Sequence, residues 1–430
     1  MKSSFQIVIL IIFIGLAIFG ILVFSGAIKI GSNNSPGSLG TVTLWGTVKS
    51  SLMSSIVEQF NKENPTIILK YQQKSADSFD QDLLEALASG TGPDIFLLPD
   101  NLAFHYANKI FTVPYSSFPV VSFKNSFAGA GEIFLTSNGT LSFPLSVDPL
   151  VMYYNRSTLD TNGIVSPPTS WDELASLVPV LTKRDESGKI IKSTVALGHF
   201  SNVNNAKDIL AAMFMQTGNQ IVSENNGVFS SDLNTLAFNY NLPSILKFYT
   251  NFADPNQGVY SWNRSFSISN DAFSREDSAF YFGFASELKS LINRNPNQNL
   301  AVAPFPQNKN VGFKLTGAHV TGVSILASSK NFNAAYTVAN LMATGNFAAK
   351  FAEVTGTVPA RRDLLRNKPE DSFSPIFYNS ALYSRSWMDP SPSGTNDIFR
   401  SMIDGVLANN MTVDNAISDA SAKLNLLLAK

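Results

Sequence analysis

The chain has 430 residues, with 31 Lys and Arg against 32 Asp and Glu, three histidines and no cysteine. At 15% charged and 44% hydrophobic residues it is too apolar to be disordered, and its length favours two domains or lobes. The balanced charge argues against nucleic-acid binding, which needs a surplus of Lys and Arg. The lack of cysteine excludes disulfides, thiolate metal sites, cysteine catalysis and a lipidated-cysteine anchor. With so few histidines, we expect no metal site and no other cofactor.

The first thirty residues predict a membrane segment. No residue from Phe5 to Ile28 is charged, and Ile7 to Phe24 consists almost entirely of Ile, Leu, Val and Phe. Such a run is long enough to cross a hydrocarbon layer of about 30 Å as a helix, whereas the apolar region of a signal peptide is usually about 7–15 residues. We therefore expect residues 1–30 to be a single-pass anchor in the cell membrane, with the rest of the chain extracytoplasmic. The alternative is a signal cleaved near Ser25-Gly26-Ala27, which would give a secreted protein. Residues 31–40 (GSNNSPGSLG) are predicted to be a flexible linker.

The first folded segment alternates strands and helices. A buried strand is predicted at 42–45, a helix at 52–60 that ends before Asn64-Pro65, and a second strand at 67–71. A helix at 79–87 follows, with Gly90 as its C-terminal cap, and then a third strand at 94–98 that is apolar on both faces. Strands separated by helices in this way form parallel βαβ units, so the fold class is α/β.

The remaining elements continue this pattern. Further strands are predicted at 150–154, 279–284 and 300–304, and a buried helix at 207–215. A turn at 167–170 precedes a capped helix in which Trp171 is interpreted as a structural residue at a surface-like turn. Two amphipathic helices are predicted at the end of the chain, at 398–407 and 413–427, the second capped by Thr412.

A search for catalytic motifs finds nothing specific. The chain has no phosphate-binding loop, nucleophile elbow, HExxH or EF-hand sequence. Ser-x-x-Lys occurs at Ser244–Lys247 and Ser286–Lys289, where we expect surface helices rather than an acyl-transfer nucleophile. A carboxylate pair for glycoside hydrolysis leaves no sequence pattern. The chain is accordingly expected not to be an enzyme, with an anchored polysaccharide-degrading enzyme as an alternative.

Five segments in order carry a resemblance to a known family. They are VTLWGT at 42–47, DLLEALASGTGPDIFLLPD at 82–100, LSFPLSVDPLVMYYNRSTLDTNGIVSPPTSWDEL at 141–174, and the stretches 277–307 and 322–365. Together they resemble family 1 of the extracellular solute-binding proteins, the maltose-binding-protein-like sugar receptors of ABC importers. The resemblance spans almost the whole chain after the linker. It departs from the family at the missing lipidated cysteine and in region 101–140, which matches no family detail.

The resemblance implies a two-lobed periplasmic-binding-protein-like fold of type II. The solute-binding domain would occupy 41–430, with one lobe at about 41–147 and 303–357 and the other at 148–302 and 358–430. A carbohydrate, mono- or oligosaccharide, would bind in the cleft between the lobes and pass to ABC permease subunits, without covalent chemistry. A monomer is expected.

The same resemblance selects candidate ligand residues, because a sugar presents hydroxyls to carboxylates and C–H faces to aromatic rings. Asp148, in the SVDPL segment, is the first choice, against capping of the turn before Pro149. The other candidates follow predicted strands or lie in loops, and each has packing or capping as its alternative: Trp45, Asp100, Phe200, Phe284 and Trp387.

Other functions within the same fold stay open at this point. The receptor could be a ligand-binding sensor subunit for a membrane kinase instead of serving a permease. The ligand could also be a non-sugar such as a glycerol phosphate or a peptide. A phosphate ligand would favour clustered Lys or Arg, and the Arg361-Arg362 pair is interpreted as a solvated turn.

Overall fold

The computed structural model describes residues 39–225, 227–234 and 242–429. The predicted anchor at 1–30 and most of the linker at 31–40 lie outside the described residues. Within the described ranges, no helix combines the length and the apolar character needed to cross a membrane.

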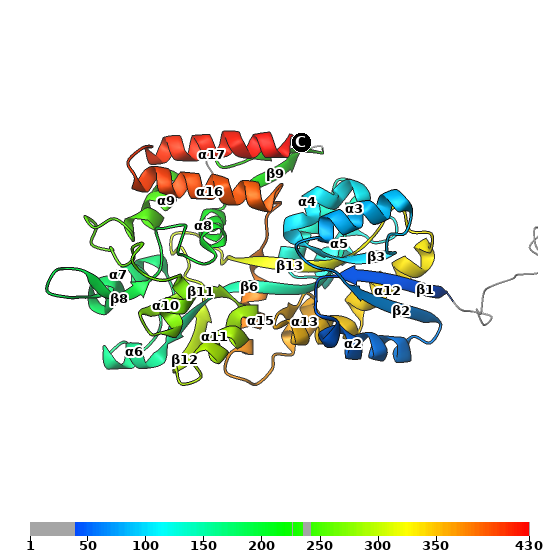
Figure 1. Cartoon of the computed structure of the whole chain (residues 1–430), viewed down its shortest axis with the longest axis horizontal. Coiled ribbons are helices and arrows are strands. Elements are labelled where there is room, and N and C mark those ends of the chain that lie inside the picture. Colours follow the sequence, from blue (N-terminus) through cyan, green and yellow to red (C-terminus); the bar gives the residue numbers. More distant parts are fainter. Residues whose placement is uncertain (1–38, 226, 235–241, 430) are drawn as a thin grey trace, which may run out of the picture.

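The first half of the molecule is the predicted βαβαβ unit (Figure 1). Strands β1 (Gly40–Gly46), β2 (Ile67–Gln73) and β3 (Ile95–Pro99) are parallel, with β1 in the middle. Helices α2 (Ser50–Glu63) and α3 (Phe79–Ser89) connect them and bury their apolar rows. Gly90 ends α3 in the left-handed region, at φ 67°, which is why glycine suits this cap. These predictions from the sequence are confirmed.

Two long antiparallel strands join this half to the second. Strand β13 (Thr316–Ile325) lies between β3 and β6 (Phe143–Asn155) and pairs with both of them. Beyond its contact with β13, β6 pairs with β11 (Ser278–Phe284) and β12 (Leu300–Pro304). Eleven of the described strands thus form one sheet. Eight of them follow the order β2-β1-β3-β13-β6-β11-β8-β7, and the other three pair with β6 or β13. In Figure 1, β6 and β13 run across the middle between two lobes.

Short strands complete the sheet and add two hairpins. Strand β15 (Ser384–Arg385) lies beside β13, so a third segment of chain reaches the region between the lobes. The other short strands are β7 (Lys183–Arg184), β8 (Ile190–Val195) and β14 (Val358–Pro359) in the sheet, and the hairpins β4 (Leu135–Thr136) with β5 (Gly139–Thr140) and β9 (Val222–Asn225) with β10 (Val228–Ser231).

Helices cover both faces of the sheet. In Figure 1 the first lobe carries, besides α2 and α3, the helices α4 (Ala103–Tyr106), α5 (Val120–Ser126), α12 (Phe332–Thr344) and α13 (Asn346–Thr355). Near the middle of Figure 1 lies α15 (Ser374–Leu382), and α14 (Arg362–Arg366) contacts it. The second lobe carries α6 (Arg156–Thr161), α7 (Trp171–Leu181), α8 (Ala206–Met215), α9 (Leu242–Asn251), α10 (Ser269–Ser274), α11 (Leu288–Arg294), α16 (Pro392–Leu407) and α17 (Val413–Leu428).

Several helix ends follow the predicted capping. The Ser170 hydroxyl accepts a hydrogen bond from the Glu173 N–H at the start of α7, and Thr412 accepts one from Asn415 at the start of α17. One interpretation is corrected. Trp171 is buried rather than at a surface-like turn, because its ring packs against Phe282 and Phe305 and its Nε1–H bonds to Gln216.

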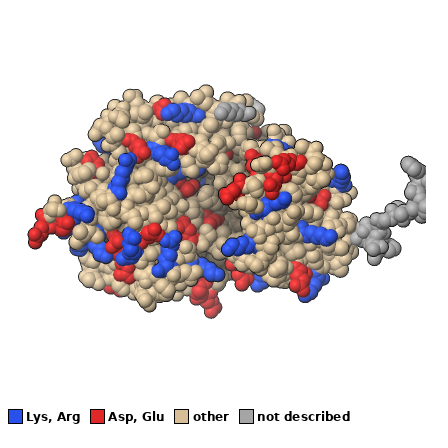
Figure 2. Space-filling model, viewed as in Figure 1, with Lys and Arg blue, Asp and Glu red and all other residues tan. Residues whose placement is uncertain are grey.

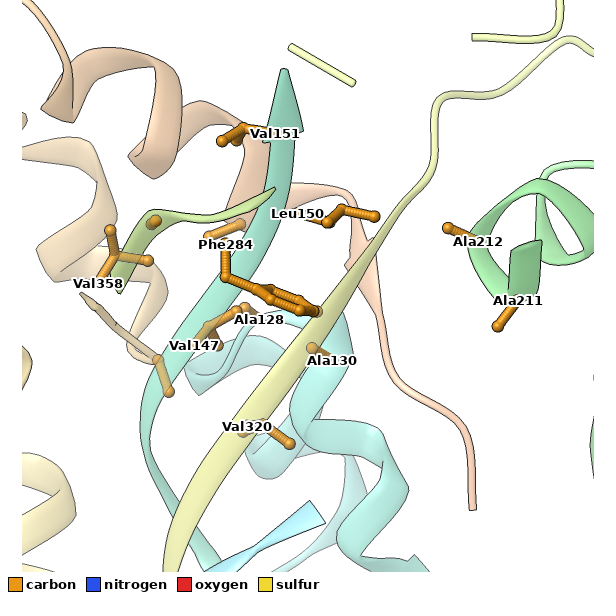
Figure 3. Close-up of a cluster of buried hydrophobic side chains, with 14 of the residues drawn as sticks. Ala128, Ala130, Val147, Leu150, Val151, Ala211, Ala212, Phe284, Val320 and Val358 are labelled. Carbon is orange, nitrogen blue, oxygen red and sulfur yellow. The ribbon is translucent and has the colours of Figure 1, made fainter. Parts of the chain in front are cut away.

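Helix α8 approaches β13 closely, and this approach shapes the region between the lobes. Figure 3 shows Ala211 and Ala212 of α8 facing β13, with the ring of Phe284 lying across that strand. A Cβ added at Gly317 would lie 3.2 Å from the Ala212 Cβ, so glycine and alanine permit the contact. The first turn of α8, with Lys207 and Asp208, is thereby brought beside the crossing strands.

Candidate ligand-binding site

A cleft between the two lobes is the main candidate for a ligand site (Figure 2). Its outer part is a cavity of about 490 Å³ whose walls come from η3 (Gly129–Phe134) and Leu135 on one side and from residues between 215 and 224 with Phe229 on the other. Its inner part, the cleft floor, is lined by charged side chains around His319. The two parts share Met215, Arg385, Ser386 and Trp387 as lining residues, so they adjoin each other.

His319 of β13 is the centre of the cleft floor. Its Nδ1 lies 3.2 Å from Asp100 Oδ1, in η1 (Asp100–Leu102) just after β3, and its Nε2 lies 3.6 Å from Asp208 Oδ1, in the first turn of α8. Burial opposes protonation, but the carboxylates of Asp100, Asp208 and Asp148 outweigh it and raise the pKa of His319 to about 10. The imidazole is therefore a cation at neutral pH, although 41% of the side chain is open to the cleft. Burial raises the pKa of Asp208, against the attraction of His319 and Lys207.

A second ion pair lies next to the first. Lys207 Nζ lies 2.8 Å from Asp389 Oδ2 and donates to Thr395 Oγ1 at 3.2 Å, and the Thr395 hydroxyl also donates to Asp389. Both members of the pair are buried, with 12% and 4% of their side chains exposed. Asp100 also accepts a hydrogen bond from the Ser386 hydroxyl. The carboxylates at the cleft floor are thus paired with cations or hydroxyls within the protein.

Aromatic rings border the same space. Phe284, at the end of β11, packs on the His319 ring with centroids 4.6 Å apart. Trp387 lines both the floor and the outer cavity, and its ring is held between Phe399, at 6.3 Å, and the Lys207 ammonium, at 5.8 Å. The cleft therefore combines flat apolar surface with charged and amide groups.

Asp148 lies at the edge of the floor, in the long strand β6. It is the cross-strand neighbour of His319, and its carboxylate accepts hydrogen bonds from the Ser286 N–H at 3.0 Å and the Ser286 hydroxyl at 2.6 Å. Burial raises the pKa of Asp148 to about 6, although Ser286 and His319 pull it down. Ser286 belongs to the short η4 (Ala285–Glu287), so this Ser-x-x-Lys serine is a partner of Asp148 and not a residue of a surface helix.

The structure brings four of the six candidate residues together. Asp100, Phe284 and Trp387 line the cleft floor, and Asp148 adjoins it. The other two lie elsewhere. Trp45 is buried in the first lobe, with the Lys74 ammonium 3.8 Å from its ring centre, and Phe200 packs against the Arg400 guanidinium at 5.1 Å.

Several cleft residues were not identified from the sequence. Region 101–140, which matched no family detail, supplies Asn101, Glu132 and Leu135 to the walls. His319 has no partner recognisable from the sequence, and its neighbours become apparent only when β13 crosses between the lobes. The remaining unpredicted residues include Lys207, Asp208, Asn219, Glu224, Phe229 and Arg385.

Two amide oxygens of the cleft lack a donor. Asn101 Oδ1 and Asn219 Oδ1 are buried without a hydrogen-bond partner among the described residues, while Asn219 Nδ2 donates to Thr217 Oγ1 at 2.9 Å. An unpaired buried acceptor costs free energy, so both oxygens are unfavourable in this arrangement of the side chains. Among the described residues, no cluster of three or more His, Asp or Glu side chains is placed to hold a metal ion.

The fold and the cleft together define a class. Two α/β lobes joined by crossing strands, with a cavity between them, are the architecture of periplasmic-binding-protein-like receptors. The family model of the bacterial extracellular solute-binding proteins matches residues 45–345, and the chain belongs to this family.

Known relatives are distant in sequence but similar along their whole length. A binding protein of Brucella abortus (strain 2308) is 22% identical over 411 residues, which is 91% of this chain and 93% of the relative. Among solved structures, the sugar-binding protein MalE of the phytopathogen Xanthomonas citri has a TM-score of 0.74 at 19% identity, over 90% of this chain and 97% of that one. The cyclic alpha-maltosyl-1,6-maltose binding protein of Arthrobacter globiformis has a TM-score of 0.73 at 16% identity, over 90% and 98%. A cyclo/maltodextrin-binding protein complexed with maltotetraose gives 0.72 at 16%, over 93% and 98%. At these identities the likeness shows the fold.

Proposed function

We propose that this protein binds a carbohydrate in the cleft between its lobes and delivers it to the permease of an ABC importer. The observation that carries the proposal is the make-up of the cleft, in which aromatic rings stand beside amides and charged groups around a cavity of about 490 Å³. Sugars need both kinds of surface. The structural relatives named above, described as sugar- or maltodextrin-binding, support the same ligand class.

Within this proposal the candidate residues have distinct roles. Phe284 and Trp387 would pack against the C–H faces of the sugar, as they border the cleft floor. Asp100 and Asp148 would accept hydrogen bonds from hydroxyls with the oxygen lone pairs that Ser286, Ser386 and His319 leave free.

The cellular arrangement is part of the proposal. Residues 1–30 would anchor the protein in the cell membrane, with the solute-binding domain extracytoplasmic and monomeric on the linker at 31–40. The lobes would follow the expected boundaries, 41–147 with 303–357 and 148–302 with 358–430. A ligand held from both sides would favour the closed arrangement of the lobes, the form that a permease would recognise. No chemical conversion of the sugar is involved.

A thermal-shift screen of the full chain tests the proposal. The probes are mono- and oligosaccharides, with amino acids, peptides and glycerol phosphates as controls. A ligand at ~100 times its dissociation constant adds about 2.7 kcal/mol of stability, a measurable shift. Stabilisation by sugars supports the proposal. Stabilisation only by the controls would leave the family membership intact and overturn the carbohydrate assignment. Turnover of a polysaccharide, detected by product analysis, would favour the anchored enzyme.

A further inference from the structure

Phe313 differs from every other phenylalanine in the described part of the chain. It alone falls in the exposed class, with 41% of its surface accessible, whereas the others are buried or half-buried. Exposing a large ring to water forgoes the free energy gained by burying it, and an exposed ring offers a flat apolar face on which a ligand ring can pack. The exposed ring of Phe313 is therefore a candidate ligand contact if it lies beside a cavity.

Phe313 stands between two cavities. It lines the outer cavity of the cleft, of about 490 Å³, and also a neighbouring cavity of about 660 Å³. The second cavity is bounded by the turn before α7, by the 303–314 segment and by Tyr383. Each volume by itself falls in the range of about 300–1,000 Å³ that small-ligand sites occupy. The ring of Phe313 is the wall that the two have in common.

The loop that carries Phe313 is fixed at its base. The buried Gln216 amide, just after α8, donates to the carbonyl oxygens of Pro306 at 2.8 Å and Leu315 at 2.9 Å, and its Oε1 accepts from Trp171 Nε1 at 2.7 Å. Gln307 closes the loop a second time, since its Oε1 accepts from the Leu315 N–H at 2.9 Å. A loop tied at both ends presents its aromatic ring in a defined place, which is what a binding platform requires.

The second cavity offers polar groups as well as the ring. Beside prolines and Phe305, its wall includes hydroxyl, amide and ammonium groups, which come from Thr169, Ser170, Gln307, Asn308, Lys309, Lys314 and Tyr383. Among the described residues Lys314 makes no ion pair. Hydroxyl-rich rings could pack on the Phe313 face and still hydrogen-bond at their edges on either side of it.

We propose that the ligand is an oligosaccharide that starts in the cleft between the lobes, crosses the face of Phe313 and continues into the second cavity. This inference rests on the proposed function and adds to it the length of the ligand and its path. A monosaccharide held at the cleft floor has no need of Phe313, whereas an oligosaccharide gains an apolar contact with each unit that reaches the ring.

Isothermal titration calorimetry with the full chain tests this path. The probes are α-1,4-linked glucose oligomers, β-1,4-linked glucose oligomers and β-1,4-linked mannose oligomers, each from one to six units. In the series that binds, we expect affinity to rise roughly tenfold or more as the chain lengthens past the first units, the scale of one well-packed aromatic contact. In Phe313→Ala the longer oligomers should bind only as well as the short ones, while the monosaccharide affinity stays within about twofold. Phe313→Tyr should keep the gain.

A matched control and the opposite outcomes complete the design. Ile191→Ala removes a comparably exposed apolar side chain from β8 and should leave all affinities unchanged. The inference is overturned if affinity does not depend on oligomer length, or if Phe313→Ala weakens short and long oligomers equally. It also falls if no sugar of any series binds, but that result would be recognised as failure of the proposed function, because the wild-type chain would then fail alongside the variant.

Discussion

The charged residues of the cleft floor balance one another within the protein. Asp100 and Asp208 share the His319 cation, and Asp389 holds Lys207. Charges removed from water are stable only when paired and hydrogen-bonded, so each of these side chains depends on its neighbours. The loss of stability on removing one member of a pair should depend on how deeply the pair is buried, and two substitutions test this.

Replacing Lys207 by Met should destabilise the protein strongly. The change leaves Asp389 buried with only Thr395 as a side-chain partner, and breaking a buried pair typically costs about 3–5 kcal/mol. Urea unfolding of the full chain measures the loss. The matched control is Lys309→Met, whose pair with Glu173 is exposed on both sides at 52% and 42%, and it should leave the free energy of unfolding nearly unchanged. Equal losses of unfolding free energy in the two variants would mean that burial does not make the Lys207–Asp389 pair more important for stability than an exposed pair.

The titration of Asp148 should make the folded protein less stable as the pH rises. Its pKa is raised from 3.8 to about 6 in the folded state, so the native protein binds the proton more tightly than the unfolded chain. The stabilisation that comes from protonating Asp148 in the folded state is therefore complete below pH 3.8, the pKa of the unfolded chain. It is lost as the pH rises through about 6, the pKa of the folded state.

The Asp148→Asn variant tests this dependence. It keeps an acceptor for the Ser286 N–H but has no charge to bury, so it should be more stable than wild type at pH 8, on the order of 1–3 kcal/mol, and nearly equal at pH 4. Thermal unfolding at the two pH values measures the difference. A variant less stable than wild type at pH 8 would show that the charge of Asp148 is stabilising, through its neighbour His319.

At the scale of elements, local patterns predicted most of the regular structure. The strands β1 to β3 were found because their apolar residues form short continuous or alternating runs, and the helices α2, α3, α16 and α17 because their apolar residues repeat at helical spacing. The caps at Ser170 and Thr412 were found because a single side chain and the next turn define them. Apolar periodicity and helix caps can be predicted because each depends only on residues that are close together in the sequence.

Other features could not be predicted because the residues involved are far apart in the chain. Region 101–140 is built from pieces such as η1, α4 and η3, of three to six residues each, too short for a periodic pattern to show. Gly129 of η3 leaves room for the Arg385 guanidinium, where a Cβ would collide, and nothing in either local sequence indicates that contact. The family resemblance placed Asp100, Phe284 and Trp387 near the cleft, but the partners His319 and Asp208 depend on how β13 and α8 pack.

The loop that carries Phe313 provides a prediction at this scale. Gln216→Leu would leave the Trp171 indole N–H and the carbonyls of Pro306 and Leu315 without their partner. Because unsatisfied buried groups cost about 1–3 kcal/mol, we expect a loss of that order in the free energy of unfolding, measured with urea.

A second measurement on the same variant separates the loop from the fold. Hydrogen exchange of segment 306–315 should become faster than in wild type, since its base is no longer tied. Gln59→Ala, which removes only an exposed bond to Glu63, is the control and should change neither quantity. Unchanged exchange in Gln216→Leu would mean that Gln307 alone holds the loop.

At the scale of the whole molecule, His319 connects the two lobes. It lies on a crossing strand, its Nδ1 faces Asp100 of the first lobe, and its Nε2 faces Asp208 of the second. The groups around it are Asp148 on β6, which is charged, and Phe284 on β11, which is not. A cation held between two carboxylates from different lobes favours the arrangement in which both are near, and so opposes opening of the cleft.

The closed arrangement of the lobes should therefore become less stable at high pH, where His319 loses its charge. The pKa of His319 is raised from 6.5 to about 10, so the stabilisation from its charge is complete below 6.5 and is lost as the pH rises through about 10. Because the chain has no cysteine, cysteines introduced at Ser51 on α2 and at Ser187 between β7 and β8, both exposed and in opposite lobes, can carry a fluorescent donor and acceptor. Energy transfer should fall between pH 7 and pH 10.5 as the lobes separate. In His319→Gln it should be lower at pH 7 and flat across this range, whereas His105→Gln, which removes an exposed histidine paired with Asp80 inside the first lobe, should follow wild type. A His319→Gln curve that coincides with wild type would show that other contacts hold the lobes together.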